Sequence, residues 1–432
     1  MSSLNGIIDD LTSGKWINPS NNKPVSIPIK KIEISKSLDG LEYDFINETH
    51  NSEKILIVSD EYTHDALGLR VFNNLNGKSD VSEFIWKKPH CSEEGVNEIQ
   101  RASKDYNSII AIGSGTINDS VKYASFLDKK KYSVFATTPM NAYTTPTASV
   151  YFNSYKKSIH THAATGVYFD LSVLSGCPQR LTAAAFADVI CRTTAQVDWL
   201  LSNILLKTPY DETPYILLGL YEEEMVANAK KIADGNLDSL ALLTKISAIM
   251  GLGTFFTGTT HSGSMAEHGI SHYIDMFFKD KHPGTSHGEQ VGIATLSVSK
   301  IQNGILNNKT PPIFHSTIIP DEEIKNKLGI EMVNNVKMQM KNKIFDNKKT
   351  DELNTYLEKN WLTFTEPLKK VMLPFEKIWS AMDDCGAKKT PNEADMDLDL
   401  YNDALKYGRF IRDRYTILDF ADDSDQLEKY ID

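Results

Sequence analysis

The chain of 432 residues has little cysteine, which restricts the kinds of site it can carry. Its four cysteines, Cys91, Cys177, Cys191 and Cys385, are widely spaced and contain no CxxC pair. This spacing fits reduced thiols and argues against a disulfide framework or a zinc knuckle. We expect the thiols to behave as small, buried apolar side chains.

Positive charge is also in short supply. The chain has 46 Lys and Arg against 57 Asp and Glu, a formal net charge of −11, and a pI of about 5.5. Because nucleic-acid affinity rests largely on neutralisation of phosphates by Lys and Arg, this balance disfavours a nucleic-acid partner. An anionic metabolite would need a local basic pocket.

Neither an export signal nor a membrane span is expected. The first residues, MSSLNGIIDDLTSGKW, mix acids with short apolar pieces and lack a basic-then-apolar order. The most apolar stretch, residues 240–257, contains Lys245, Gly251 and Gly253, and a polar stretch with histidines follows it. A buried helix is therefore expected here rather than a membrane helix, and a cytoplasmic location follows by default.

The pattern along the chain changes near residue 180. Before it, short β-rich runs alternate with helical patterns: KILIV at residues 54–58, SIIAI at 108–112 and YSVFA at 132–136. Each run is followed by turn-forming or polar residues, as expected for a parallel sheet with crossover helices. The first fold prediction is thus an α/β domain over residues 1–178.

After residue 180, amphipathic stretches dominate and strand-like runs are almost absent. The longest are residues 183–205, 222–233 and 240–250, whereas residues 303–349 are rich in Asn and Lys and predict loops and short helices. The second prediction is an all-helical domain over residues 179–432. A chain of this length can bury more than one core.

The strongest signal in the first half is a glycine-containing turn between a strand and a helix. In IIAIGSGTINDSVKYAS a buried strand runs into Gly113, Ser114 and Gly115. Glycines let backbone approach a phosphate closely, and the following helix points its positive end and free N–H groups at the loop. The spacing is not GxGxxG, so an ordinary strand-to-helix turn remains open on this evidence alone.

Asp60 follows the predicted strand at residues 54–58 after one serine. A carboxylate there can accept hydrogen bonds from an adenosine ribose and would repel a 2′-phosphate, which favours NAD over NADP. A helix N-cap is the competing interpretation.

The second half holds a set of metal-ligand residue types. Asp188 is surrounded by Ala, Phe, Val and Ile in LTAAAFADVICRTTAQVDWLLS, and a buried carboxylate must be paired or bound to a cation. His268 and His272 in AEHGISHYID are four residues apart, on one face of a helix, and His287 follows in TSHGEQVGI. One carboxylate and two imidazoles suit zinc, iron or nickel.

These motifs together resemble one enzyme family. GSGTINDSVK is similar to the GGGxxxDxxK loop of the iron-containing alcohol dehydrogenase and dehydroquinate synthase-like superfamily. AAAFADVICRTTAQVDW, SGSMAEHGISHYID, SHGEQVGIATL and IRDRYTILDF look like segments of its sn-glycerol-1-phosphate dehydrogenases. The resemblance runs from about Ile29 to Phe420. It implies a dinucleotide-binding α/β domain and an all-α metal domain, with the active site in a cleft between them.

The resemblance also implies roles for particular residues. The metal ligands would be Asp188, His268 and His287. The substrate contacts would be Thr145, Asp188 and His272. The catalytic residues would be Asp188, His268, His272 and His287. NAD(H) or NADP(H) would contact two segments and two single residues: Asp60, Gly113, Ser114, Gly115, Thr116, Ile117, Asn118, Asp119, Met140, Asn141, Ala142, Tyr143 and Ser149.

The implied reaction is hydride transfer between nicotinamide and a carbonyl carbon polarised by a divalent metal, zinc before nickel or iron. The substrate would be a polyol phosphate and its ketone, such as glycerol 1-phosphate and dihydroxyacetone phosphate. His272 lies one turn from a metal ligand and would assist proton transfer. A homodimer is implied as well.

One departure concerns the substrate face. Where the family typically has a segment like PTAASNDGIASP, this chain has PMNAYTTPTASV, so that Thr145 replaces an acid and Pro146 a glycine. Hydrogen bonds to charged groups contribute roughly 1.5–3 kcal/mol, so a changed substrate preference is expected. Candidates for phosphate recognition are Lys156, Lys157, His160, His162 and Arg192, with solvated or structural roles favoured for them.

The same motifs allow three alternative functions. A lyase of the sugar-phosphate cyclase branch would use the same metal and a transient oxidation by NAD, but that branch typically has Glu at the first ligand position. A dehydrogenase acting on a different polar alcohol is a closer alternative. An inactive relative is disfavoured, because packing alone does not require two imidazoles and a buried acid.

Overall fold

The computed structural model describes residues 6–51, 53–153 and 155–431. The chain divides into two compact units by its internal contacts: Met1–Ala185 with Glu212–Thr259, and Phe186–Asp211 with Thr260–Asp432. Within residues 171–431, all of which are described, every regular element is a helix. The domain boundary at residue 178, taken from the change in sequence pattern, stays a prediction.

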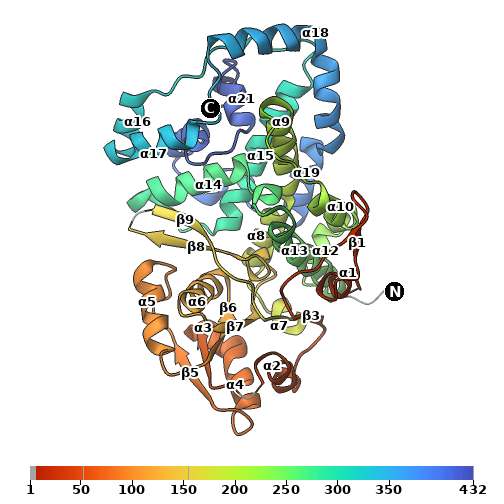
Figure 1. Ribbon diagram of the computed structural model, residues 1–432, viewed down its shortest axis with the longest axis vertical. Helices are drawn as coiled ribbons and strands as arrows, with labels where there is room; N and C mark the ends of the chain where they lie inside the picture. The colour runs from red at the N-terminus through yellow and green to blue at the C-terminus, as the bar shows by residue number, and fades with distance from the viewer. Residues whose placement is uncertain (1–5, 52, 154, 432) are drawn as a thin grey trace. The chain divides into compact units, whose positions relative to one another are not determined.

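The first unit is built on a six-stranded parallel sheet (Figure 1). Its strands lie in the order β3 (Lys31–Ser35), β10 (Gly166–Asp170), β7 (Lys131–Ala136), β6 (Ser108–Gly113), β4 (Ile55–Ser59) and β5 (Val81–Ile85). The three strands predicted from sequence are confirmed as β4, β6 and β7. Ile57 pairs with Ile110 and Ile110 with Ser133, which fixes the register at the centre of the sheet.

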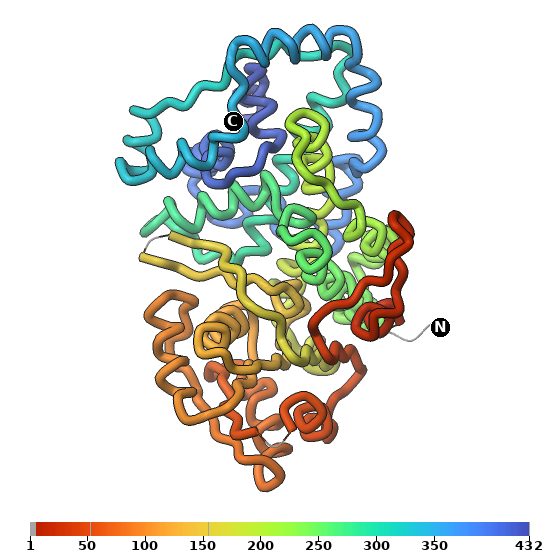
Figure 2. Tube along the Cα trace, in the orientation of Figure 1, coloured from red at the N-terminus to blue at the C-terminus, as the bar shows by residue number. Residues whose placement is uncertain are grey.

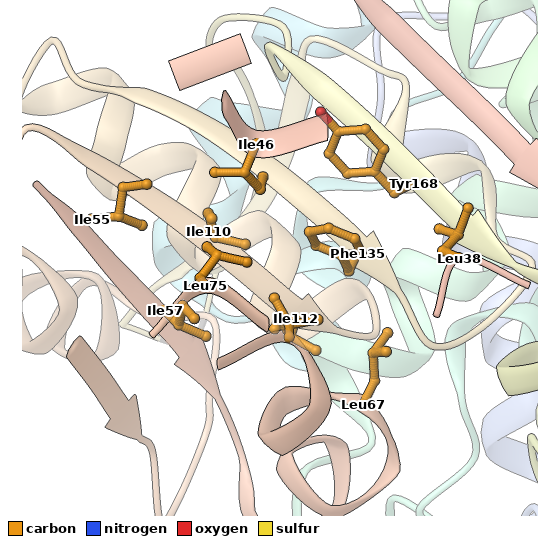
Figure 3. Close-up of a cluster of buried hydrophobic side chains, with 11 residues drawn as sticks. Leu38, Ile46, Ile55, Ile57, Leu67, Leu75, Ile110, Ile112, Phe135 and Tyr168 are labelled. Carbon is orange, nitrogen blue, oxygen red and sulfur yellow. The ribbon is translucent and has the colours of Figure 1, made fainter. Parts of the chain in front are cut away.

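One face of the sheet carries a continuous apolar core (Figure 3). Ile55 and Ile57 of β4 and Ile110 and Ile112 of β6 pack there, and each is 0–1% exposed. Because side chains alternate along a strand, every second residue of these buried strands faces the same way. Helices α2 (Glu42–His50) and α4 (Leu69–Leu75) cover this face with side chains that include Ile46 and Leu75.

Crossover helices connect the parallel strands. Helix α5 (Glu93–Ala102) lies between β5 and β6 in sequence, and α6 (Gly115–Leu127) lies between β6 and β7. These two helices pack on each other, and α6 packs on β6. Figure 2 follows these crossovers along the orange part of the trace. A hairpin, β8 (Thr147–Phe152) and β9 (Tyr155–His160), extends the chain beyond β7.

The first unit also contains helices from the later segment: α10 (Thr213–Gly219), α11 (Glu222–Ala227), α12 (Ala229–Ala233) and α13 (Leu237–Thr257). Helix α13 is long and apolar enough to cross a membrane by composition, but 78% of its most apolar window is buried inside the fold. This is the buried helix expected over residues 240–257. Among the described residues, no other helix passes that test.

The second unit is helical. Its principal helices are α9 (Arg192–Leu206), α14 (Ala266–Phe277), α15 (His287–Leu306), α16 (Asp321–Leu328), α17 (Ile330–Met340), α18 (Asn347–Val371), α19 (Phe375–Asp384), α20 (Leu398–Tyr407) and α21 (Ile417–Asp422). Short helices do occupy part of residues 303–349, as predicted.

The helix expected over residues 183–205 is interrupted. Helix α8 (Gln179–Ile190) ends before Cys191, and α9 begins at Arg192. The hydroxyls of Thr193 and Thr194 donate to the carbonyls of Ile190 and Cys191 at 3.0 and 2.9 Å. Such back-bonding competes with the helical ladder and bends helices. The amphipathic pattern continued through this break, so sequence alone did not reveal it.

Candidate metal and dinucleotide sites

Three helices bring together Asp188, His268 and His287, all of which belong to the second unit. Asp188 lies near the end of α8, His268 is in the first turn of α14, and His287 is the first residue of α15. Oδ1 of Asp188 lies 3.7 Å from Nε2 of His268 and 4.0 Å from Nε2 of His287. The three ligand atoms all lie within 4.8 Å of one another.

These separations suit atoms that share a metal ion better than atoms that bond to each other. Metal–ligand bonds of roughly 2.0–2.2 Å in a tetrahedron place donors roughly 3.3–3.6 Å apart. Asp188 and His268 are 3% and 7% exposed, whereas the His287 side chain is 29% exposed. The three residues therefore fit a divalent cation. Asp188 and His268 would hold it from the buried side, and the side next to His287 is accessible to solvent.

The other ring nitrogen of each histidine has its own partner. Nδ1 of His268 lies 3.0 Å from Oε1 of Glu267, and Nδ1 of His287 lies 3.0 Å from the hydroxyl of Ser271. The Ser271 hydroxyl in turn donates to Oε1 of Gln290 at 2.7 Å. Such contacts select the tautomer and ring orientation that leave Nε2 for a metal.

The N-terminus of α14, which carries His268, is pinned by two buried carboxylates. Asp198 accepts from the amide of Ala266 at 3.3 Å, and Glu267 accepts from the amide of Met265 at 2.7 Å. Burial raises the pKa of Asp198, and the nearby Glu267 raises it further. Backbone amides at a helix start are natural partners for such oxygens, so the first turn is held rigidly behind the metal-ligand set.

A second group of possible ligands shares His268 and adds Cys191 and Glu267. Here the Cys191 thiol donates to the carbonyl of Gly263 at 3.4 Å, and burial raises its pKa well above the ordinary value. A thiolate is the metal-binding form, so this cysteine is poorly suited to bind one. Its contacts agree with the expectation of a buried apolar thiol.

His272 lies one turn beyond His268 on α14 and is 6% exposed. Its ring centroid is 6.3 Å from that of His287. This places His272 beside the three ligands without including it among them. Its predicted role as a substrate contact stays a prediction.

In the first unit, the order of the strands creates a point where ligands commonly bind. From β4 the chain crosses to β5 on one side, whereas from β6 it crosses to β7 on the other. Ligands of open α/β sheets bind outside the carboxyl ends of strands at such a switch point. The residues that follow these two strands are Asp60 and the loop of Ser114 and Gly115.

The two glycines of the loop have different surroundings. A Cβ at Gly113 would lie 2.8 Å from two atoms of Ile117, so packing excludes a side chain there. A Cβ at Gly115 would find only Cε of Met140, at 4.0 Å. Open space over the first residue of α6 is what a phosphate at a helix N-terminus requires.

Asp119 and Lys122 tie α6 to the segment that follows β7. Lys122 is fully buried, and its Nζ donates to the carbonyls of Ala142 and Thr147 at 2.7 and 2.8 Å and to Oδ1 of Asp119 at 3.3 Å. Oδ2 of Asp119 accepts from the amide of Ser149 at 2.9 Å. Burial lowers the pKa of Lys122, and Asp119 opposes this effect. The two residues therefore position residues 142–149, a task that the loop motif alone did not indicate.

Further contacts bring the other predicted cofactor segment to the glycine loop. The Tyr143 hydroxyl donates to the carbonyl of Gly113 at 2.9 Å and bonds to Thr138 at 2.6 Å. Nδ2 of Asn118 donates to the carbonyl of Ala142 at 3.0 Å. Tyr143 is fully buried and Asn118 is buried, so both hold the backbone in place. The predicted cofactor residues 113–119 and 140–143 thus form one region.

Thr145, which replaces the family's acid, lies in the same region. Its hydroxyl is 2.9 Å from that of Thr147 and 3.4 Å from that of Thr254 on α13. A Cβ at Gly251 would lie 2.2 Å from the hydroxyl oxygen of Thr144, so α13 can approach this loop only through a glycine. The close packing fixes the loop that carries Thr145.

Asp60 is an N-cap in this structure. Its Oδ1 accepts from the amide of Thr63 at 2.8 Å, and the Thr63 hydroxyl lies 3.0 Å from the Asp60 amide, which forms a capping box. The structure thus shows the helix N-cap that the sequence allowed as an alternative to a ribose contact. The predicted ribose contact is not tested by it.

The phosphate candidates of the sequence mostly have structural surroundings. His162 is 2.9 Å from the Ser125 hydroxyl and stacks on Tyr132, and burial lowers its pKa. Nη1 of Arg192 donates to Oε1 of Gln196 at 2.7 Å. Arg412 and Arg414, which were not among the candidates predicted from sequence, contact Ser264 just before α14. Both arginines belong to IRDRYTILDF, a motif that indicated the family resemblance but no role for them.

Comparison with known proteins identifies the fold. Residues 34–178 match the family model described as iron-containing alcohol dehydrogenase. A solved iron-containing alcohol dehydrogenase from Corynebacterium glutamicum superposes with a TM-score of 0.62 over 94% of this chain and 95% of its own, at 10% identity. The chain therefore has the fold of the iron-containing alcohol dehydrogenases, as its sequence predicted.

Several curated proteins to which the chain is similar are named glycerol-1-phosphate dehydrogenase [NAD(P)+]. The protein of that name from Halalkalibacterium halodurans is 30% identical over 57% of this chain and 64% of its own length. The one from Bacillus subtilis is 26% identical over 64% of this chain and 72% of its own. The chain thus matches just under two thirds of the first of these relatives. The family resemblance read from the motifs is confirmed.

Proposed function

We propose that this chain is a metal-dependent, NAD(P)-linked dehydrogenase that interconverts a polyol phosphate and its keto form. Glycerol 1-phosphate and dihydroxyacetone phosphate, or a close relative, are the proposed pair. The observation that carries the proposal is the set of Asp188, His268 and His287, with Nε2 of both rings near the carboxylate and Nδ1 of both rings occupied elsewhere. The printed names of the relatives support the substrate.

The ligand chemistry supports zinc first, with nickel or iron as alternatives, because one carboxylate and two imidazoles suit all three. When bound, such a metal would supply Lewis-acid polarisation of a carbonyl oxygen. Glu267 and Ser271 would keep the two rings oriented for it. His272 would hold a proton for the alcohol oxygen that forms during reduction.

The coenzyme would be NAD(H) or NADP(H), which supplies the hydride. Its pyrophosphate would lie at the open N-terminus of α6 over Gly115, where the amides of Thr116 and Ile117 have no partner within the helix. Asp119 and Lys122 would act indirectly by holding Met140 to Ser149 in place. Asp60, at the end of the neighbouring strand, would contact the ribose through Oδ2, because Oδ1 accepts from the amide of Thr63.

The test is a coupled measurement of metal content and turnover. We expect the purified protein to hold about one divalent metal ion per chain and to oxidise NADH or NADPH with dihydroxyacetone phosphate. Asp188→Asn should lose both the metal and the activity, because it removes the charged ligand between two imidazoles. His315→Gln, at a side chain that is 59% exposed, serves as the matched control and should behave as the parent protein.

Two outcomes would contradict the proposal. Metal-free protein with full turnover would remove the metal from the mechanism. Product formation without net consumption of NADH would favour the cyclase-type lyase instead. The family resemblance further predicts a cytoplasmic homodimer that acts on a small molecule without nucleic acid or membrane partners; light scattering in solution tests the dimer.

A further inference from the structure

Two arginines near the C-terminus, Arg412 and Arg414, lie close together and donate to neutral groups of one short segment. Nη1 of Arg412 donates to the hydroxyl of Ser264 at 2.5 Å. Arg414 donates to the backbone carbonyl of Ser264 and, at 2.8 Å, to the hydroxyl of Thr260. All of these acceptors are neutral. Among residues 6–51, 53–153 and 155–431, neither guanidinium forms an ion pair.

This arrangement contrasts with Arg409, only three residues earlier. Arg409 is buried and lies within 3.3 Å of three carboxylates, those of Asp419, Asp422 and Asp423, whereas Arg412 and Arg414 are half-buried. Buried charges in proteins are normally paired in this way, because an unpaired ion loses its hydration without compensation. Arg412 and Arg414 lie in the same segment but have no such ion pair within the described residues.

The surroundings of the two guanidinium groups disfavour their positive charge. Burial lowers the pKa of Arg412 to about 10, with only Asp413 and Glu267 acting against it. Burial and then the charge of Arg412 lower the pKa of Arg414 well below its ordinary value. Nε of Arg414 is buried and has no hydrogen-bond partner in the described chain. A donor of this kind is costly unless something bonds to it.

A histidine belongs to the same cluster. His261 stacks at a tilt on Trp199, with ring centroids 5.5 Å apart. Burial and, after it, the charges of Arg414 and Arg412 together lower the pKa of His261 to about 2. The three basic groups therefore share one neighbourhood, and each would be stabilised by the arrival of negative charge.

The cluster adjoins the metal-ligand set within the second unit. Thr260 and Ser264 flank the short helix η3 (His261–Gly263), which leads directly into α14. Ser264 precedes the predicted ligand His268 by four residues. After Asp413, Glu267 is the second carboxylate whose charge stabilises both arginines, and it is also the partner of Nδ1 of His268.

We infer that Arg412 and Arg414, with the hydroxyls of Ser264 and Thr260, form an anion subsite that binds the phosphate group of the substrate. A guanidinium presents a planar fork of donors that matches phosphate oxygens in pairs, and two of them match a dianion. The inference deepens the proposed function and rests on it for the identity of the ligand. It also supplies the local basic pocket that an acidic chain needs for an anionic metabolite.

The first test uses inorganic phosphate and does not depend on turnover. Metal-free and coenzyme-free protein is titrated with phosphate, and the melting temperature and heat of binding are followed. We expect phosphate to raise the melting temperature of the parent protein, since a ligand that binds only the folded state stabilises it. Arg412→Gln should weaken phosphate binding by roughly tenfold or more.

The same variant separates an anion site from a structural clamp. If Arg412 serves to bind anions, removal of its unpaired charge leaves the melting temperature in phosphate-free buffer unchanged or higher. If Arg412 serves to hold residues 411–415 against Ser264, the melting temperature falls and the response to phosphate persists, which would overturn the inference. Arg412→Lys keeps a charge and a donor, and it provides the same phosphate titration should the glutamine variant fail to fold.

The second test separates the possible sources of the phosphate. With dihydroxyacetone phosphate, Arg412→Gln should raise KM by roughly 10- to 100-fold while kcat changes much less. KM for unphosphorylated dihydroxyacetone and for NADPH should stay as in the parent protein. A rise confined to KM for NADPH would assign the cluster to the coenzyme's 2′-phosphate and overturn the inference.

Lys348→Gln is the matched control, because it removes one positive charge from a side chain of α18 that is 86% exposed. It should leave the phosphate titration unchanged. Equal phosphate binding by the parent and Arg412→Gln proteins would refute the subsite even if the enzyme proves to be a dehydrogenase. Conversely, phosphate binding that depends on Arg412 in a protein without dehydrogenase activity would refute only the proposed function.

Discussion

The Nδ1 atom of His268 lies 3.0 Å from Oε1 of Glu267, its immediate neighbour in sequence. Consecutive residues of a helix usually point in different directions. Here both lie in the first turn of α14, where Glu267 bends back to accept from the amide of Met265 as well. The buried Glu267 therefore links the start of the helix to the orientation of a proposed metal ligand.

This link predicts the effect of Glu267→Gln. The amide can still accept one hydrogen bond, but it removes the negative charge that lies beside Nδ1 of His268. Metal affinity should fall roughly 10- to 100-fold, the usual range for partners of a ligating histidine. Metal titration of the chelator-treated protein measures this. Unchanged affinity in a folded variant would show that Glu267 serves only to cap the helix.

The two loop glycines should respond in opposite ways to alanine. Gly113→Ala places a Cβ 2.8 Å from Ile117 and should lower the melting temperature, whereas Gly115→Ala meets nothing closer than 4.0 Å and should fold normally. If coenzyme pyrophosphate approaches α6 over Gly115, only the second variant should lose NADH affinity without loss of stability. Fluorescence titration with NADH and thermal denaturation decide this together. Normal NADH binding by Gly115→Ala would place the coenzyme elsewhere.

Thr145→Asp should change substrate preference. The resemblance places an acid here, and the Thr145 hydroxyl has two hydroxyl neighbours, Thr147 and Thr254, that could donate to a carboxylate. We expect kcat/KM for dihydroxyacetone phosphate to rise by roughly tenfold, as expected for a hydrogen bond to a charged acceptor. Thr145→Asn is the neutral control. A fall in kcat/KM for both variants would mean that this chain prefers a substrate suited to the native threonine.

Acid should destabilise the first unit through His50. This side chain is fully buried and lies 2.7 Å from the Ser133 hydroxyl, and burial lowers its pKa to about 4. The unfolded chain takes up the proton near pH 6.5, so the contribution of His50 to stability is complete above that pH and is lost as pH falls towards 4. The maximum effect is about 3 kcal/mol by this linkage.

His50→Gln should therefore flatten the pH dependence of unfolding between pH 6.5 and 4, measured by urea denaturation. His315→Gln, at an exposed site, should leave that dependence as it is. An equally steep dependence in both variants would assign the acid sensitivity to other groups.

Much of the fold was predictable because the signals are local. KILIV, SIIAI and YSVFA are apolar runs of strand length followed by turn-forming or polar residues, and they became β4, β6 and β7. Strands β3 and β5 are the edge strands of the sheet, and β10 has a weaker apolar pattern. None of these three strands was predicted from the sequence. The break at Cys191 was also missed, because it depends on which carbonyls two threonine hydroxyls reach.

The sequence by itself determined the chemistry available: one buried acid, histidines at helical spacing and a glycine turn after a strand. Only the tertiary structure decided that Asp188, His268 and His287 meet, since they are separated by many residues and by side-chain directions that packing sets. It likewise decided that Lys122 supports a loop, that Asp60 caps a helix, and that Arg412 and Arg414 lie unpaired near α14. Burial and partners determine what a charged side chain does, and neither is a local property of the chain.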